Sequence, residues 1–299
     1  MRTWSETKAA YRFFQNDNVD VDKIMAAHRA KTAKRIEGKR IVLSIQDTTF
    51  AVYTKHPKTQ GLGVVSLNHG KNKEKIYSHG LAMHTCLALS DQGDPLGLLS
   101  QNIAARELRP ENQRPRKGGK RINNLPVEEK ESYRWIEALE ATASIDTDAL
   151  VVTICDRECD FYDFFKSSND KGAAVVVRAS QNRTVNKTSR YAEKEVEKLR
   201  EFIERQPLSG TYQVEVSALE KTKHCKGRTA RTADIEVRFA KYVLNPPRNH
   251  PEHKTGRLSD IDMYAVYARE KDPPEGEDAL DWRDPSAMRG TYPDELGSR

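Results

Sequence analysis

One short run of β-branched and aliphatic residues limits the folds open to this chain. The segment 149–155, ALVVTIC, is apolar on both alternating faces, which is typical of a strand buried within a sheet. The chain then becomes acidic and aromatic at Asp156, and one short helical segment, 161–167, separates it from a second apolar run, 173–178. Because short helical crossovers join parallel strands, the pattern predicts a mixed α/β sheet with flanking helices.

Asp156 has two interpretations at the end of this run. It, or Asp160, could cap the following helix by accepting a backbone hydrogen bond. Alternatively, it could hold a metal ion, because open α/β sheets place their chemistry just beyond the carboxyl ends of their strands.

A second carboxylate favours the metal interpretation. Asp47 directly follows another predicted strand, RIVLSIQ at 40–46, and in a mixed sheet the first strand can lie beside the fourth. Two carboxylates that face each other need a cation between them, since their charges otherwise repel. Oxygen ligands of this kind suit Mg²⁺, with Mn²⁺ as a substitute.

Hydrophobic periodicity predicts the other elements. We expect helices over 5–15, 20–37, 128–143 and 191–205, and strands over 79–89, 96–105, 211–218, 234–241 and 262–270. These elements divide the sequence into a helical N-terminal region at 1–38, an α/β core at 39–190, a region of one helix and several strands at 191–282, and a tail without regular structure at 283–299.

Charge and composition restrict the environment and the partners. The sequence holds 50 Lys and Arg against 44 Asp and Glu, a net charge of +6, which permits nucleic-acid binding without requiring it. Basic runs at 106–121, 178–190 and 221–231 lie in loop-like sequence that could contact phosphates. With no signal peptide, no membrane-spanning run and four cysteines without zinc-finger spacing, we expect a cytoplasmic protein with reduced thiols.

Several motifs, taken together, resemble one enzyme family. The segments AYRFFQNDNV, IQDTTF, HGLAMHTCLALSDQGDPLGLL, KESYRW, CDRECD, VVVRASQNR and DPPEGEDALDW occur in this order between residues 10 and 282. They resemble motifs of bacterial cut-and-paste DNA transposases of the insertion-sequence four family, of the transposon-five type. The resemblance implies a ribonuclease H-like core, with a β-rich insertion before the last catalytic helix.

The resemblance also implies roles for particular residues. Asp47 and Asp156 match the first two of three acidic residues that bind two Mg²⁺ ions for phosphodiester hydrolysis and strand transfer. Arg178 matches an arginine that contacts transposon-end DNA, and Arg183 in the same motif is a further candidate DNA contact. Trp282 matches a tryptophan that packs against a flipped-out base. The implied partners are double-stranded DNA at transposon ends and a second transposase chain, near the bacterial nucleoid and not at a membrane.

The third acid of the family, a glutamate on a helix beyond the matched Trp282, has no counterpart in this sequence. Glu275, Glu277 and Glu295 lie in Pro- and Gly-flanked segments without a helix to position them. His69, His79 and His84 are weak alternatives as ligands, and His79 and His84 lie in an alternating strand pattern.

We therefore expect a transposase shortened at both ends, and our hypothesis for its C-terminal end is a frameshift just after Trp282. Its alternatives are a DNA-binding or inhibitory remnant without activity, and a nuclease that works with two carboxylates.

Overall fold

A computed structural model describes most of the chain as a mixed α/β protein. The described residues are 3–53, 55, 58–69, 75–106, 125–185, 197–222, 227–250, 252, 258–281 and 286–289. They form two compact units: unit 1 comprises residues 1–108 with 140–151, and unit 2 comprises residues 109–139 with 152–299. Within these described residues, no helix has both the length and the hydrophobicity that a membrane span requires.

Unit 1 begins with the two helices that the sequence predicts, α1 (Trp4–Phe14) and α2 (Val21–Ile36). Thr3 and Glu6 form a capping box at the start of α1, and Asp20 accepts hydrogen bonds from the Asp22 and Lys23 amides at the start of α2. These side chains satisfy amide groups that have no partner within the helix.

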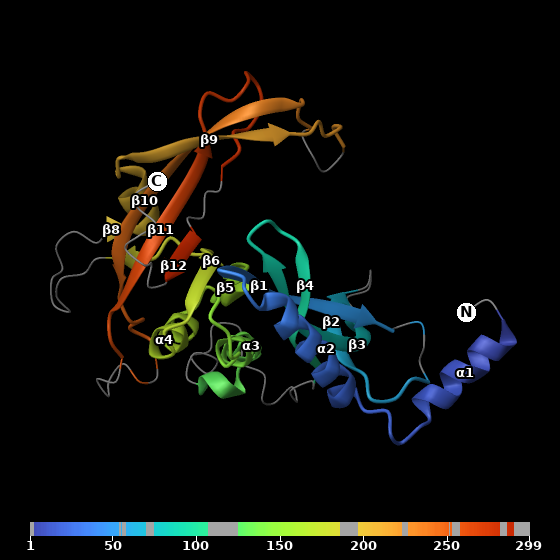
Figure 1. Cartoon of the computed structure of the whole chain (residues 1–299). Helices are drawn as coiled ribbons and strands as arrows, with labels where there is room; N and C mark the ends of the chain where they lie inside the picture. Colours follow the sequence, from blue (N-terminus) through green and yellow to red (C-terminus); the bar gives the residue numbers. More distant parts are fainter. Residues whose placement is uncertain are drawn as a thin grey trace. The chain divides into compact units, whose positions relative to one another are not determined.

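The sheet of unit 1 is built around β3 (Lys75–Ser90) (Figure 1). It pairs antiparallel with β1 (Ile41–Val52) along one edge, and with β2 (Gly63–His69) and β4 (Pro95–Ala104) along the other. The predicted meander of β1, β3 and β4 is confirmed, whereas β2 lies where the sequence predicts a polar loop. The first strand continues past residue 46, so Asp47 lies within β1 and not at its end.

Helix α2 packs on β4 through a close backbone approach. Arg35 Nη1 donates to the Leu96 carbonyl at 3.0 Å, and the Leu98 amide donates to His28 Nε2 at 2.9 Å. Gly97 lies between them with φ of +135°, and a Cβ atom there would come within 2.2 Å of the Thr32 hydroxyl. Thr32 is fully buried, so this contact leaves no room for a side chain at position 97.

We predict that Gly97→Ala destabilises unit 1 by about 3 kcal/mol, because it adds both backbone strain and a clash with Thr32. Gly38→Ala serves as a control, since Gly38 also has positive φ but open space at its Cβ position. It should cost only about 1 kcal/mol. Urea unfolding of both variants measures the difference, and equal losses would contradict the role of the Thr32 contact.

Unit 2 contains the apolar strand predicted over 149–155, in which Thr153 and Cys155 are buried and the other residues are partly buried. β5 (Leu150–Cys155), which begins at the end of unit 1's range, pairs parallel with β6 (Ala174–Arg178), with Cys155 opposite Val177. The 3-10 turn η3 (Arg157–Cys159) and α4 (Tyr162–Asp170) connect the two strands. Their core includes Phe164, Phe165 and Val177.

The segment before β5 adds one more covering helix. The 3-10 turn η2 (Val127–Glu129) precedes α3 (Tyr133–Ala143), so the predicted helix over 128–143 is divided into two elements. Trp135 and Leu139 of α3 are buried in the core of unit 2. This burial follows from the helical spacing of apolar residues in the sequence.

The predicted β-rich region follows β6. It contains β7 (Thr184–Val185), β8 (Glu197–Lys198), the short α5 (Leu199–Glu204), β9 (Leu208–Val216), β10 (Arg231–Leu244) and β11 (Ile261–Glu270). β10 and β11 are the long orange strands in Figure 1, and β10 pairs antiparallel with both β9 and β11. The three long predicted strands are confirmed. Of the helix predicted over 191–205, residues 191–196 lie outside the described residues, 197–198 form β8, and α5 covers 199–204.

The expectation of a tail without regular structure at 283–299 is wrong for Ser286–Arg289. These residues form β12, which pairs antiparallel with β6 on one side and with β11 on the other. This strand hydrogen-bonds backbone groups of β6 and β11 that would otherwise lack partners. Because backbone pairing stabilises β12 without an apolar sequence pattern, hydrophobic periodicity does not predict the strand.

Candidate functional site

The candidate site lies at the carboxyl ends of the parallel strands β5 and β6. Asp156 directly follows β5 and Arg178 is the last residue of β6. Because Cys155 pairs with Val177, the register places Asp156 and Arg178 next to each other at the same edge of the sheet. Both residues are exposed at this edge of unit 2.

Asp156 shows the capping geometry that the sequence allows. Its Oδ1 accepts a hydrogen bond of 2.8 Å from the Glu158 amide at the start of η3. No described residue contacts Oδ2 with a hydrogen bond or ion pair. One oxygen therefore fixes the orientation of the carboxylate, while the other can still bind a cation. The two interpretations of Asp156 are compatible.

Asp47 belongs to unit 1, where it lies on β1 opposite Thr85 of β3. Its side chain is exposed, and within the described residues no hydrogen bond or ion pair reaches its carboxylate. The pairing of Asp47 with Asp156 across one metal site stays a prediction.

A complete metal-ligand set is absent from the described parts of the chain, where no group of three His, Cys, Asp or Glu side chains could hold an ion. His84 is already bonded to two side chains of β1, through Nδ1 to Thr48 Oγ1 at 2.8 Å and through Nε2 to Gln46 Oε1 at 3.4 Å. The fit to Mg²⁺ is therefore limited to the individual carboxylates of Asp47 and Asp156.

The acidic residue with the largest structural role is Asp160, which the sequence presents only as a possible helix cap. Its side chain is fully buried and does not cap α4, whose first residue is preceded by Phe161. Instead, Oδ2 accepts hydrogen bonds from the Ser180 amide at 2.7 Å and the Ser180 hydroxyl at 3.1 Å. The Gln181 amide donates to the same oxygen at 3.3 Å.

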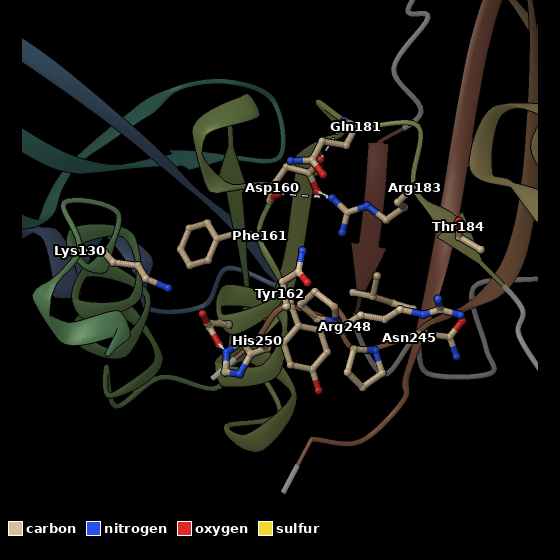
Figure 2. A pocket seen from close by; sticks show the side chains of 15 residues that line it. Lys130, Asp160, Phe161, Tyr162, Gln181, Arg183, Thr184, Asn245, Arg248 and His250 are labelled. Carbon is tan, nitrogen blue, oxygen red and sulfur yellow. Dashed lines mark hydrogen bonds and ion pairs between the residues drawn. The ribbon is translucent and has the colours of Figure 1, made fainter. Parts of the chain in front are cut away.

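Arg183 completes this cluster (Figure 2). Its guanidinium forms an ion pair with Asp160 Oδ1 and lies over the Phe165 ring, with Cζ 5.6 Å from the ring centroid. The Arg183 side chain is only 13% exposed, which differs from the predicted role as a free DNA contact. The ion pair with Asp160 holds the guanidinium in place, and sequence alone could not show this contact across 23 positions.

We predict that Asp160→Ala destabilises unit 2 by about 3–5 kcal/mol, since it leaves the Arg183 charge buried and removes the acceptor for three donors at Ser180 and Gln181. Asp170→Ala, which breaks the exposed pair with Lys166, is the control and should cost less than about 1 kcal/mol. Chemical unfolding compares the two, and similar losses would contradict the assigned role of Asp160.

A cavity of about 470 Å³ adjoins this cluster in unit 2 (Figure 2). Asp160 and Arg183 line one part of it, and an Asp163–His250 pair lines another. His250 Nε2 lies 2.7 Å from Asp163 Oδ1, and His250 Nδ1 accepts from the Glu252 amide at 3.1 Å. The sequence contains no local motif that links His250 to Asp163, so this pair was missed.

Of the three glutamates considered as a third acid, Glu277 is already engaged by other groups of the protein. Glu277 accepts hydrogen bonds from the Thr229 amide and hydroxyl and pairs with Arg231 Nη1 at 2.6 Å. These contacts lower the pKa of Glu277. Glu275 is exposed in the turn before it. Arg231 also pairs with Glu270 at 2.7 Å, so Arg231, Glu270 and Glu277 form one structural cluster.

This cluster gives a prediction for pH dependence. Hydrogen bonding to Arg231 lowers the pKa of Glu270 below its ordinary value of 4.5. Stability from the ionised carboxylate is therefore complete above pH 4.5 and is lost as the pH falls through the lower folded-state pKa. We expect Glu270→Gln to reduce the pH dependence of unfolding below pH 4.5, measured by urea unfolding from pH 3 to 7.

An unchanged pH dependence in Glu270→Gln would contradict this assignment. Asp262→Asn is a matched control, because Asp262 makes an exposed pair with Lys241. It should leave the acid limb of the stability curve close to that of the wild-type chain.

The remaining residues with a predicted site role are not part of the candidate site. Trp282 and Glu295 lie outside the described residues, as do most of the basic run 106–121 and parts of the runs 178–190 and 221–231.

Cys155 and Cys159, which flank Asp156, are buried and form no disulfide. Burial and the neighbouring Cys155 raise the pKa of the Cys159 thiol, which keeps it protonated and disfavours it as a metal ligand.

The comparison of the whole chain with protein families identified no matching family model.

Proposed function

We propose that this chain is a DNA transposase of the cut-and-paste type, related to the insertion-sequence four family, with a ribonuclease H-like core. The observation that supports this most directly is the placement of Asp156 beside Arg178 at the carboxyl ends of β5 and β6. These are the matched second acid and the matched DNA-contacting arginine of the family. Parallel-strand register makes them neighbours although 22 positions separate them in the sequence.

The chemistry of this pair suits a phosphodiester substrate. Arg178 is exposed, and no ion pair engages it within the described residues, so it can contact a backbone phosphate. The unused oxygen of Asp156 can bind a divalent cation. In the proposal Asp47 supplies the second carboxylate. Mg²⁺, or Mn²⁺ in its place, would activate water and stabilise the leaving oxygen when bound.

The β-rich region after β6 is consistent with the same proposal. β9, β10 and β11 follow the two core strands in the order that the family resemblance implies. Its basic loops, together with Trp282, are the proposed contacts with double-stranded transposon-end DNA. A second transposase chain is the proposed protein partner.

A second candidate is a DNA-binding or inhibitory protein without cleavage activity. It is favoured by the lack of a three-ligand cluster in the described residues and by the engagement of Glu277 with Arg231. In that case the Asp156–Arg178 edge would bind DNA but would not complete the chemistry.

DNA binding is the first test. A duplex carrying the inverted repeats that flank the encoding gene is titrated with wild-type protein and with Arg178→Ala at several salt concentrations. The variant should bind more weakly, and its salt slope should fall by about one unit, because one phosphate contact is lost. Lys271→Ala removes an exposed positive charge elsewhere in unit 2 and should bind like wild type.

Cleavage separates the two candidates. A supercoiled plasmid with the same repeats is incubated with Mg²⁺ or Mn²⁺ and wild-type protein, Asp47→Asn, Asp156→Asn, or the exposed control Asp146→Asn. Nicking that is lost only in the first two variants supports the transposase. Binding without nicking supports the inactive DNA-binding protein, and the absence of both in folded protein overturns the proposal.

A further inference from the structure

The cavity in unit 2 is formed by three segments that are distant in sequence. Its walls come from the start of α4 at 161–163, the segment 181–184 after β6, and the turn 244–250 after β10, with Lys130 at one side (Figure 2). Asp156 and Arg178 do not line it. A volume of about 470 Å³ is within the range of small-molecule pockets.

The charges of the lining favour an anionic ligand. The Arg183 charge is neutralised by Asp160. The Glu252 amide donates to His250 Nδ1, so His250 Nε2 is the ring nitrogen that donates to Asp163.

Two cations remain. Lys130 and Arg248 line the cavity, and neither forms an ion pair with a described carboxylate. Figure 2 shows their side chains on opposite sides of the pocket. The cavity therefore has an excess of positive charge over its only other carboxylate, Asp163, which already accepts a hydrogen bond. Phosphate is an anion that both arginine and lysine side chains commonly bind.

The rest of the lining suits a planar ring. Phe161, Pro246 and Pro247 present apolar surfaces to the cavity, and Gln181 and Asn249, which carry primary amides, also line it. Primary amides carry both a donor and an acceptor, which is the combination that recognises the edge of a nucleobase. Apolar walls with a few polar groups are typical of pockets that orient a ring.

The geometry points to a binding site for a single nucleotide. Its phosphate contacts Arg248 on one side of the cavity, its base packs against the Phe161 and proline surfaces with its edge at the amides, and Lys130 on the opposite side donates to the base. The ligand is a free nucleotide or the terminal nucleotide of a DNA strand, since both present the same phosphate and base. This site is separate from the proposed cleavage edge and requires neither a metal ion nor duplex DNA.

Isothermal titration of the whole protein tests this inference without divalent cations. Deoxyadenosine monophosphate, deoxyadenosine and inorganic phosphate are the probes. The monophosphate should bind at least about tenfold more tightly than either fragment, because only it uses both the cations and the ring surfaces. Arg248→Ala and Lys130→Ala should each weaken it by about tenfold or more, since each removes a charge-assisted contact.

Controls keep the result specific to the cavity. Lys271→Ala removes one exposed charge outside the cavity and should bind the monophosphate like wild type. No measurable binding to folded wild-type protein, or unchanged binding in both cavity variants, overturns the inference. Equal affinity for inorganic phosphate and the monophosphate overturns the assignment to a nucleotide.

Competition identifies the source of the nucleotide. A single-stranded oligonucleotide with a 5′ phosphate that displaces the monophosphate, and does so more weakly in Arg248→Ala, supports a strand terminus as the ligand. Monophosphate binding that the oligonucleotide does not displace supports a free nucleotide. Because this assay contains no duplex and no metal, it can fail while transposon-end binding succeeds, and the reverse also holds.

Discussion

The buried carboxylate of Asp160 is the interaction on which the candidate surfaces of unit 2 depend. It accepts hydrogen bonds from Ser180 and Gln181 and forms an ion pair with Arg183, so it joins the segment after β5 to the segment after β6. Those two segments carry Asp156 and Arg178 at one edge of the sheet, and they also form walls of the cavity. A buried charge that is satisfied by several donors holds both segments in one arrangement.

Much of the fold could be predicted from the sequence, because its elements have strong local patterns. The strand ending at Cys155 and the helix predicted over 20–37 have signals contained within a few positions, and both are confirmed. β2 and β12 could not be predicted, since their pairing partners are set by neighbouring strands and not by their own composition. The extension of β1 through Asp47 depends in the same way on pairing with β3.

The site was predictable only in part, for a related reason. The positions of Asp156 and Arg178 follow from strand ends and parallel pairing, which a sequence pattern can indicate. The partners of Asp160 and Asp163 cannot be found this way, because Arg183 and His250 reach them across 23 and 87 positions. Arg183 illustrates the difficulty: a basic segment predicts solvent or DNA contact, whereas one buried carboxylate assigns its guanidinium to the protein interior.

The strand β12 also has a consequence for the order in which the protein can form. It lies between β6 and β11, although it is the last of these three strands to be synthesised. While the ribosome is still translating the codons before residue 286, β6 and β11 each present an unpaired edge. The sheet of unit 2 can therefore close only after residue 289 has been translated, and a nascent chain held before that point exposes two edges to intermolecular pairing.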